Sequence, residues 1–69
     1  MKAWTYKGIT AATEKQIIDY MGKAASRSDG VADMYREWAY GAFNLWAEIT
    51  KGEWREEDFE HLRKLACPD

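Results

Sequence analysis

The apolar positions of residues 31–51 recur with the period of an α-helix. At about 100° per residue, most of them fall on one broad face: Val31, Met34, Tyr35, Trp38, Ala42, Leu45, Trp46 and Ile49, widened by Ala32, Ala39 and Phe43. The opposite side carries Asp33, Glu37, Asn44, Glu48 and Lys51. A helix that packs on one neighbour needs an apolar arc of roughly 100°. Because this arc is wider, we predict a long central helix that packs between two neighbours.

The same segment contains a seam of alternating four- and three-residue steps at positions 31, 35, 38, 42, 45 and 49. This spacing is typical of knobs-into-holes packing against a nearly antiparallel helix. Ala39 and Ala42 would allow such a neighbour to approach closely. We therefore predict that this seam faces the core.

A second strip lies toward the polar side of the predicted central helix and consists of Arg36, Tyr40, Phe43 and Ala47. One interpretation is that the N-terminal segment covers this strip. The other is an exposed aromatic patch that meets a partner, because Tyr, Trp and Arg dominate the anchors of protein interfaces. The sequence leaves both interpretations open.

Residues 1–12 carry Trp4, Tyr6 and Ile9 among Lys and Thr residues, in a loose period-two pattern. Alternation of this kind is typical of a strand or an extended segment, so we predict a short extended N-terminal arm. The arm would either lie across the helices through Trp4 and Tyr6 or pair with the same arm of a second subunit.

Thr13 and Gln16 form the pattern of a capping box, in which the threonine caps a helix and the glutamine reaches back to the threonine amide. We therefore predict a first helix over about residues 14–26. Gly22 lies inside this helix beside its apolar face, where an aromatic ring packed over it would explain the glycine. The turn that follows contains Ser28 and Asp29, either of which can cap the central helix.

The C-terminal third begins at Gly52, which can end the central helix in a left-handed conformation without strain. A third helix over about residues 55–66 carries a narrow apolar stripe of Phe59, Leu62, Leu65 and Ala66, with Trp54 at its entry. The predicted fold is therefore one all-α domain over residues 1–69, with the arm at 1–12 and helices at about 14–26, 31–51 and 55–66.

Few residues in the chain could carry chemistry. The one cysteine, Cys67, excludes an intramolecular disulfide, and the one histidine, His61, argues against a structural zinc site. The acidic residues of segment 53–60 spread around a helix and do not converge as metal ligands would. The five glycines are isolated, so no phosphate-binding loop is formed. We predict no enzyme activity, no catalytic residue, no bound metal and no cofactor.

Charge and hydropathy narrow the partner and the compartment. The net charge is −2, with +2 on residues 1–30 and −4 on residues 31–69. A nucleic-acid-binding domain usually shows a strong basic patch, so this balance favours a protein partner. No segment approaches the roughly 20 apolar residues of a membrane span, and the N-terminus contains no apolar run typical of a signal peptide. Together with the lack of disulfides, this predicts a cytoplasmic protein without membrane association.

These observations favour a small cytoplasmic protein-binding module. It would act stoichiometrically as an inhibitor, adaptor or regulatory subunit of a larger protein, in the style of accessory proteins of phages and mobile elements. The residues predicted to contact the partner are Arg36, Tyr40, Phe43, Ala47, Trp4, Tyr6 and Trp54. The first alternative is a nucleic-acid-binding regulator that uses the basic N-terminal half. The second is a self-associating structural module, in which two copies form a homodimer.

Overall fold

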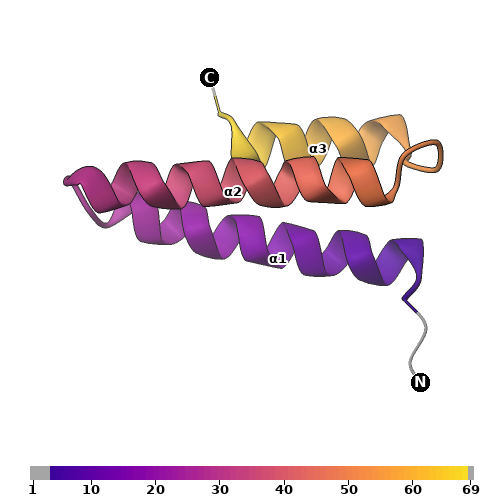
Figure 1. The fold of residues 1–69 in the computed structure, drawn as a ribbon, viewed down its shortest axis with the longest axis horizontal. Helices are drawn as coiled ribbons and strands as arrows, with labels where there is room; N and C mark the ends of the chain where they lie inside the picture. The colour runs from indigo at the N-terminus through magenta and orange to yellow at the C-terminus, as the bar shows by residue number, and fades with distance from the viewer. Residues whose placement is uncertain (1–3, 69) are drawn as a thin grey trace.

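The computed structural model describes residues 4–68, which form three α-helices. Helix α1 spans Tyr6–Ala25, α2 spans Gly30–Ile49 and α3 spans Glu56–Ala66. Two short connections reverse the chain, so that α2 runs antiparallel to both α1 and α3 (Figure 1). The predicted all-α three-helix fold is confirmed. However, α1 and α2 both have 20 residues, so the central helix is not longer than its neighbour.

Helix α1 begins at Tyr6, where the sequence pattern predicted an extended arm. The hydroxyl of Thr5 accepts a hydrogen bond from the Gly8 amide at 3.0 Å and caps the helix. The predicted arm is therefore wrong for residues 6–12, while residues 1–3 lie outside the described part of the chain. Tyr6 and Ile9 are three residues apart, which places both on the side of α1 that packs against the core.

Thr13 lies in the interior of α1 and does not cap it, so the predicted capping box is wrong. Its hydroxyl donates to the Ile9 carbonyl oxygen one turn earlier, at 2.8 Å. The prediction that an aromatic ring packs over Gly22 is also wrong. Among the described residues, a Cβ at Gly22 would meet no side chain within 4 Å.

Helix α2 begins after Asp29, one of the two residues predicted to cap it. The Asp29 carboxylate accepts a hydrogen bond from the Val31 amide at 3.2 Å and pairs with Arg27 at 3.1 Å. The hydrogen bond from the Arg27 guanidinium lowers the pKa of the Asp29 carboxyl below its usual range. The carboxylate is therefore charged at neutral pH beside the positive end of α2, where a negative charge is favoured.

Helix α2 ends at Ile49, two residues before the predicted end. Thr50 follows as the C-cap, and its buried hydroxyl donates to the Trp46 carbonyl oxygen at 2.7 Å. Gly52 has a φ of 86°, so the predicted left-handed conformation after the helix is confirmed.

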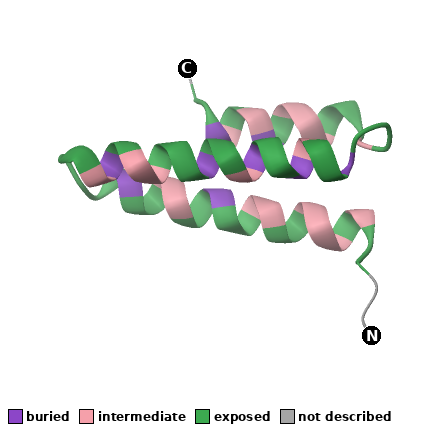
Figure 2. Cartoon of the chain, viewed as in Figure 1, coloured by how far each residue is buried: buried purple, intermediate pink, exposed green. Residues whose placement is uncertain are grey.

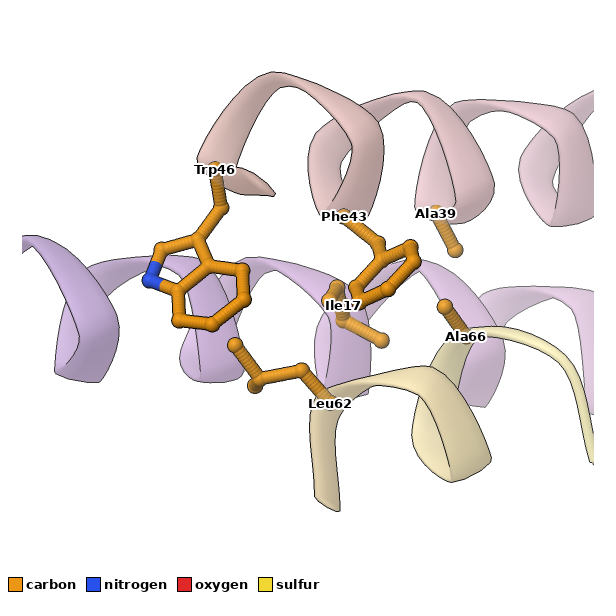
Figure 3. Packing of buried hydrophobic residues seen from close by; sticks show 6 residues of the cluster. All are labelled: Ile17, Ala39, Phe43, Trp46, Leu62 and Ala66. Atoms are coloured by element: carbon orange, nitrogen blue, oxygen red, sulfur yellow. The ribbon is translucent and has the colours of Figure 1, made fainter. Parts of the chain in front are cut away.

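The core lies where the three helices meet. Figure 2 shows buried positions along the facing sides of the helices, and Figure 3 shows how six of these side chains pack. The cluster consists of Ile17 from α1, Ala39, Phe43 and Trp46 from α2, and Leu62 and Ala66 from α3. Helix α2 contacts both neighbours, as predicted, but α1 also contacts α3. The bundle is therefore triangular, and α2 is not a middle layer.

The face of α2 that enters the core differs from the predicted seam by a rotation of about 100°. The buried residues of α2 are Ala32, Ala39, Phe43 and Trp46. Three residues of the predicted seam remain exposed: Trp38 by 47%, Leu45 by 62% and Ile49 by 54%. The prediction that the seam at 31, 35, 38, 42, 45 and 49 faces the core is therefore wrong for Trp38, Leu45 and Ile49, whereas Ala42 packs against the core cluster. The physical reason is that the Trp46 ring is buried and its Nε1–H donates to the Thr10 hydroxyl of α1, which turns this side of α2 inward.

Helix α3 packs on the core with the predicted apolar stripe. Leu62 and Ala66 are buried, and the Phe59 ring meets the Phe43 ring edge-on, with centroids 5.1 Å apart. The helix begins at Glu56, within one residue of the prediction, and ends at Ala66 as predicted. Because α3 has only 11 residues, it runs beside the C-terminal half of α2 and leaves the other half to α1 alone (Figure 1).

We predict that Thr5→Ala lowers the free energy of unfolding by about 1 kcal/mol, because it removes the N-cap of α1. Thr13→Ala is the matched control. Its hydroxyl bonds only within its own helix and alanine is the better helix former, so the loss should stay below about 0.5 kcal/mol. Urea unfolding followed by circular dichroism measures both values. An equal loss in the two variants would contradict the start of α1 at Tyr6.

We also predict that Phe43→Ala lowers the free energy of unfolding by about 3–5 kcal/mol, since the side chain is only 5% exposed and leaves a cavity. This is a large part of the roughly 5–15 kcal/mol that holds a small domain together. Ile18→Ala, at an exposed site on α1, should change the value by less than about 1 kcal/mol. Urea titration of both variants tests this. A stable Phe43→Ala protein with unchanged unfolding would show that Phe43 does not lie in the core.

Candidate protein-binding surface

Apolar residues of α2 form a second stripe beside the face that enters the core. Trp38, Leu45 and Ile49 are its exposed large residues. Gly41 and Ala42 lie between them, and Met34 extends the stripe toward the start of the helix. We call this set the open stripe: Met34, Trp38, Gly41, Ala42, Leu45 and Ile49. Its positions span an arc of about 100° on α2, which is the width of a surface that packs against one neighbour.

Helix α1 supplies the other wall of this surface. One shallow groove is lined by Gln16 and Tyr20 of α1 and by Glu37, Trp38, Gly41, Ala42 and Leu45 of α2. An adjoining groove is lined by Ala12, Thr13, Gln16, Ala42, Leu45, Trp46 and Ile49. The two grooves share Gln16, Ala42 and Leu45, so they form one continuous surface. We call it the open face, because no residue of α3 lines it.

An aromatic cluster fixes one end of the open face. The Trp38 ring meets the Tyr20 ring at a centroid distance of 5.7 Å and the Tyr35 ring at 5.4 Å, both edge-on. Tyr20 and Tyr35 stack on each other at 6.3 Å. Such pairs add about 0.5–1.5 kcal/mol each beyond their buried area. The exposed Trp38 ring is therefore held in place before any partner arrives.

Charges border the open face unequally. On the α2 side, Glu37 lines the groove and Glu48 is exposed beside Ile49. On the α1 side, the Lys23 ammonium pairs with the Asp19 carboxylate at 3.0 Å and lies 5.9 Å from the centre of the Tyr35 ring. The hydrogen bond to Asp19 raises the pKa of Lys23. The α1 border is thus neutralised locally, whereas the α2 border is acidic.

A second, more polar pocket of about 500 Å³ lies between α1 and α3. The Tyr6 hydroxyl donates to the Asp58 carboxylate at 2.7 Å and accepts a hydrogen bond from the Arg55 amide at 2.9 Å. Nearby, the His61 ring contacts the Glu14 carboxylate. These contacts join the start of α1 to α3, so we interpret the pocket as a structural junction between the two helices.

The Tyr6 hydroxyl titrates above its ordinary range. Burial is the main cause of the raised pKa, and the Asp58 carboxylate raises it further, whereas the hydrogen bond from the Arg55 amide opposes the shift.

Asp58 belongs to the acidic segment 53–60 that could have suggested a metal site. Within residues 4–68, no group of three or more His, Cys, Asp or Glu side chains could hold a metal ion.

The strip of Arg36, Tyr40, Phe43 and Ala47, which was predicted from the sequence to contact a partner, is only partly exposed. Helix α3 packs against one part of it and leaves the other part open. Phe43 lies in the core, and Ala47 is half-buried against it. Tyr40 is 49% exposed, and Arg36 is exposed and paired with Asp33 at 2.9 Å. The N-terminal segment does not cover this strip, because α3 packs against Phe43. An exposed patch of the whole strip is not found either, since its central ring is buried.

The other three residues proposed for contact lie at one end of the bundle. Trp54 is half-buried, with its ring 6.2 Å from that of Trp46 and 4.9 Å from that of Phe59. Tyr6 is half-buried at the junction of α1 and α3. Trp4 is 70% exposed. The structure therefore brings Tyr6 and Trp54 to the core and does not join them to Arg36 or Tyr40 in one surface.

Sequence reasoning missed the open face because it assigned Trp38, Leu45 and Ile49 to the core. The signal was present in the width of the apolar arc of α2. An arc wide enough for two neighbours can be covered by α1 and α3 together, or it can be covered in part by them and in part by a partner molecule. Only the packing of α1 and α3 on Trp46 and Phe43 shows which part of the arc is left over.

Comparisons of the chain with protein-family models, with curated proteins and with solved structures find no match. Of the helices in residues 4–68, none is both long and apolar enough to cross a membrane. Cys67 is a free, exposed thiol.

We predict that Tyr6→Phe lowers the free energy of unfolding at neutral pH by about 1 kcal/mol, because it removes two hydrogen bonds between α1 and the start of α3. The raised pKa means that folding favours the protonated phenol. Its contribution is full below the unfolded value of 10.0 and is lost as pH rises through the higher folded value. Urea unfolding at neutral and alkaline pH should show a smaller alkaline loss for Tyr6→Phe than for the unmodified chain. Identical pH profiles would contradict the assignment.

Proposed function

We propose that this chain is a small protein-binding module that acts stoichiometrically, as an inhibitor, adaptor or regulatory subunit of a larger protein. Its binding surface is the open face, and the occupant is the apolar side of an amphipathic α-helix of the target. The observation that carries the proposal is the exposure of Trp38, Leu45 and Ile49 on one continuous groove between α1 and α2.

The shape of the open face supports a helical occupant. Two antiparallel helices border a groove that runs along both of them, and an amphipathic helix fits such a groove with side chains at three- and four-residue spacing. Trp38 is the natural anchor, because tryptophan is enriched among the residues that dominate binding energy. Because the aromatic cluster already fixes the Trp38 ring, binding loses little side-chain entropy at this position.

The border charges specify the target helix further. Because Glu37 and Glu48 make the α2 border acidic, a target helix with Lys or Arg beside its apolar stripe would match the surface. Complementary charges of this kind raise the association rate and select the orientation of the partner. The binding should therefore weaken as salt is added.

The nucleic-acid alternative receives less support from the same residues. Lys23 and Arg27, two cations of the basic N-terminal half, pair with Asp19 and Asp29 at 3.0 Å and 3.1 Å. Phosphate binding would have to compete with these carboxylates.

The proposal includes no catalytic role, and it places the protein in the cytoplasm, where a reducing medium suits the free thiol of Cys67.

The proposal is tested by capture from native-host lysate with tagged, folded variants. The unmodified chain should recover one protein in near-equal amount after nuclease treatment. Leu45→Glu should reduce this recovery more than about tenfold, because it places a charge at the centre of the apolar groove. Ile18→Glu is the matched control at an exposed isoleucine that lies outside the open face, and it should capture the target normally.

A photo-crosslinker at Leu45 should then label an amphipathic helix of the captured protein. Equal recovery by Leu45→Glu and the unmodified chain would overturn the assignment of the open face. Loss of all captured material with nuclease would favour the nucleic-acid alternative instead.

A further inference from the structure

The open stripe is nearly symmetric about its own centre. Around the midpoint between Gly41 and Ala42, Trp38 lies as far to one side as Leu45 lies to the other. Met34 and Ile49 form the next symmetric pair. If an antiparallel copy of the same helix packed on this stripe, Trp38 would lie opposite Leu45 of the copy, and Met34 would lie opposite Ile49. The two smallest residues, Gly41 and Ala42, would lie at the crossing point.

Gly41 is not explained by packing within one chain. Among the described residues, a Cβ at Gly41 would meet no side chain within 4 Å, and its backbone is helical without a positive φ. A glycine inside a helix costs about 1 kcal/mol relative to alanine. A close approach by another helix at this point is a physical reason for keeping the side chain absent.

We infer that, when no target is bound, a second copy of this chain covers the open face. The two α2 helices pack antiparallel across a twofold axis between Gly41 and Ala42, with Trp38 of each copy against Leu45 of the other. The α1 walls then face each other beside them, so that the two hairpins form a four-helix bundle with α3 on the outside of each half. A twofold contact of this kind uses the same patch on both copies.

The available area is close to what such a dimer needs. Helices of 20 residues are about 30 Å long, and two of them packed side by side present a face about 20 Å wide. Each copy can therefore cover about 600 Å², or about 1,200 Å² for both, which is the lower limit of specific interfaces. We expect a reversible dimer that a target helix can displace.

Charge separates the self-contact from target binding. A twofold axis that relates antiparallel helices brings the same edge of each copy together. Glu37 and Glu48 of one copy thus lie near those of the other, and their repulsion weakens the dimer. Salt should strengthen the dimer by screening this repulsion, whereas it should weaken binding of a basic target helix.

This inference depends on the open face of the proposed function and adds its regulation, because dimer and target compete for one surface. Light scattering and sedimentation of the full chain over a range of concentrations test it. We expect a concentration-dependent dimer that dissociates less at high salt. Gly41→Leu should weaken it about tenfold or more by overpacking the crossing point, with no loss of helix content.

Gly22→Leu is the matched control, since Gly22 is also a helical glycine with open space around its Cβ position, on the outer side of α1. It should leave the dimer intact. In a Cys67→Ser background, Ala42→Cys should form an interchain disulfide on mild oxidation, because the twofold axis brings the two positions within about 7 Å. Ala11→Cys, which lines the pocket between α1 and α3, should not.

A monomer at every concentration would overturn the inference. A dimer that persists in Gly41→Leu, or that crosslinks through Ala11→Cys and not through Ala42→Cys, would overturn it too. The proposed function would survive these results if target capture still required Leu45. Conversely, loss of the dimer in Leu45→Glu with unchanged target capture would support the self-contact and refute the target site.

Discussion

The indole ring of Trp46 joins the three helices of this protein. It is 1% exposed, and its Nε1–H donates to the Thr10 hydroxyl of α1 at 2.9 Å. Its ring lies 6.4 Å from that of Phe59 in α3 and 6.2 Å from that of Trp54 before α3. A buried indole N–H needs an acceptor, and an unpaired one costs about 1–3 kcal/mol. The hydrogen bond to Thr10 thereby sets the rotation of α2 about its own axis.

This rotation decides what remains on the outside. With Trp46, Phe43 and Ala39 turned inward, the residues about 100° around the helix must face outward, and these include Trp38 and Leu45. The chain thus has more apolar surface on α2 than its own helices can cover. Large contiguous apolar patches on soluble proteins mark interaction sites, which is why both the proposed function and the self-contact are placed here.

The parts of the structure that were predictable depend on local signals. Gly52, the apolar stripe of α3 and the Asp29 cap follow from neighbouring residues, and the structure has each of them. The start of α1 was harder to predict, because Thr5 and Thr13 are both residues of a type that caps helices. Tyr6, which follows Thr5, is held in the helix by its contact with Asp58, far away in the chain. The face of α2 could not be chosen locally. Its deciding contact joins Trp46 to Thr10, which lies 36 residues earlier in the chain.

The candidate site was unpredictable for the same reason. Phe43 and Trp38 are both aromatic residues of one amphipathic helix, and nothing in their immediate neighbours separates core from surface. The contacts that place Phe43 inside come from Phe59 of α3. Of the residues proposed from sequence, Tyr40 and Arg36 did prove to be exposed, because they lie beside the C-terminal end of α3, at Ala66 and Cys67, where the helix no longer covers α2.

The two short connections, at residues 26–29 and 50–55, also constrain the order in which the chain can fold. Closing a short loop costs less entropy than closing a long one, and proteins rich in local contacts fold quickly. We therefore expect the contacts of α2 with both of its neighbours in sequence to form before Tyr6 meets Asp58, which lies 52 residues away. Whichever pair forms first, docking of α3 covers one apolar side of the α1–α2 hairpin and leaves the other side, the open face, exposed in the native protein.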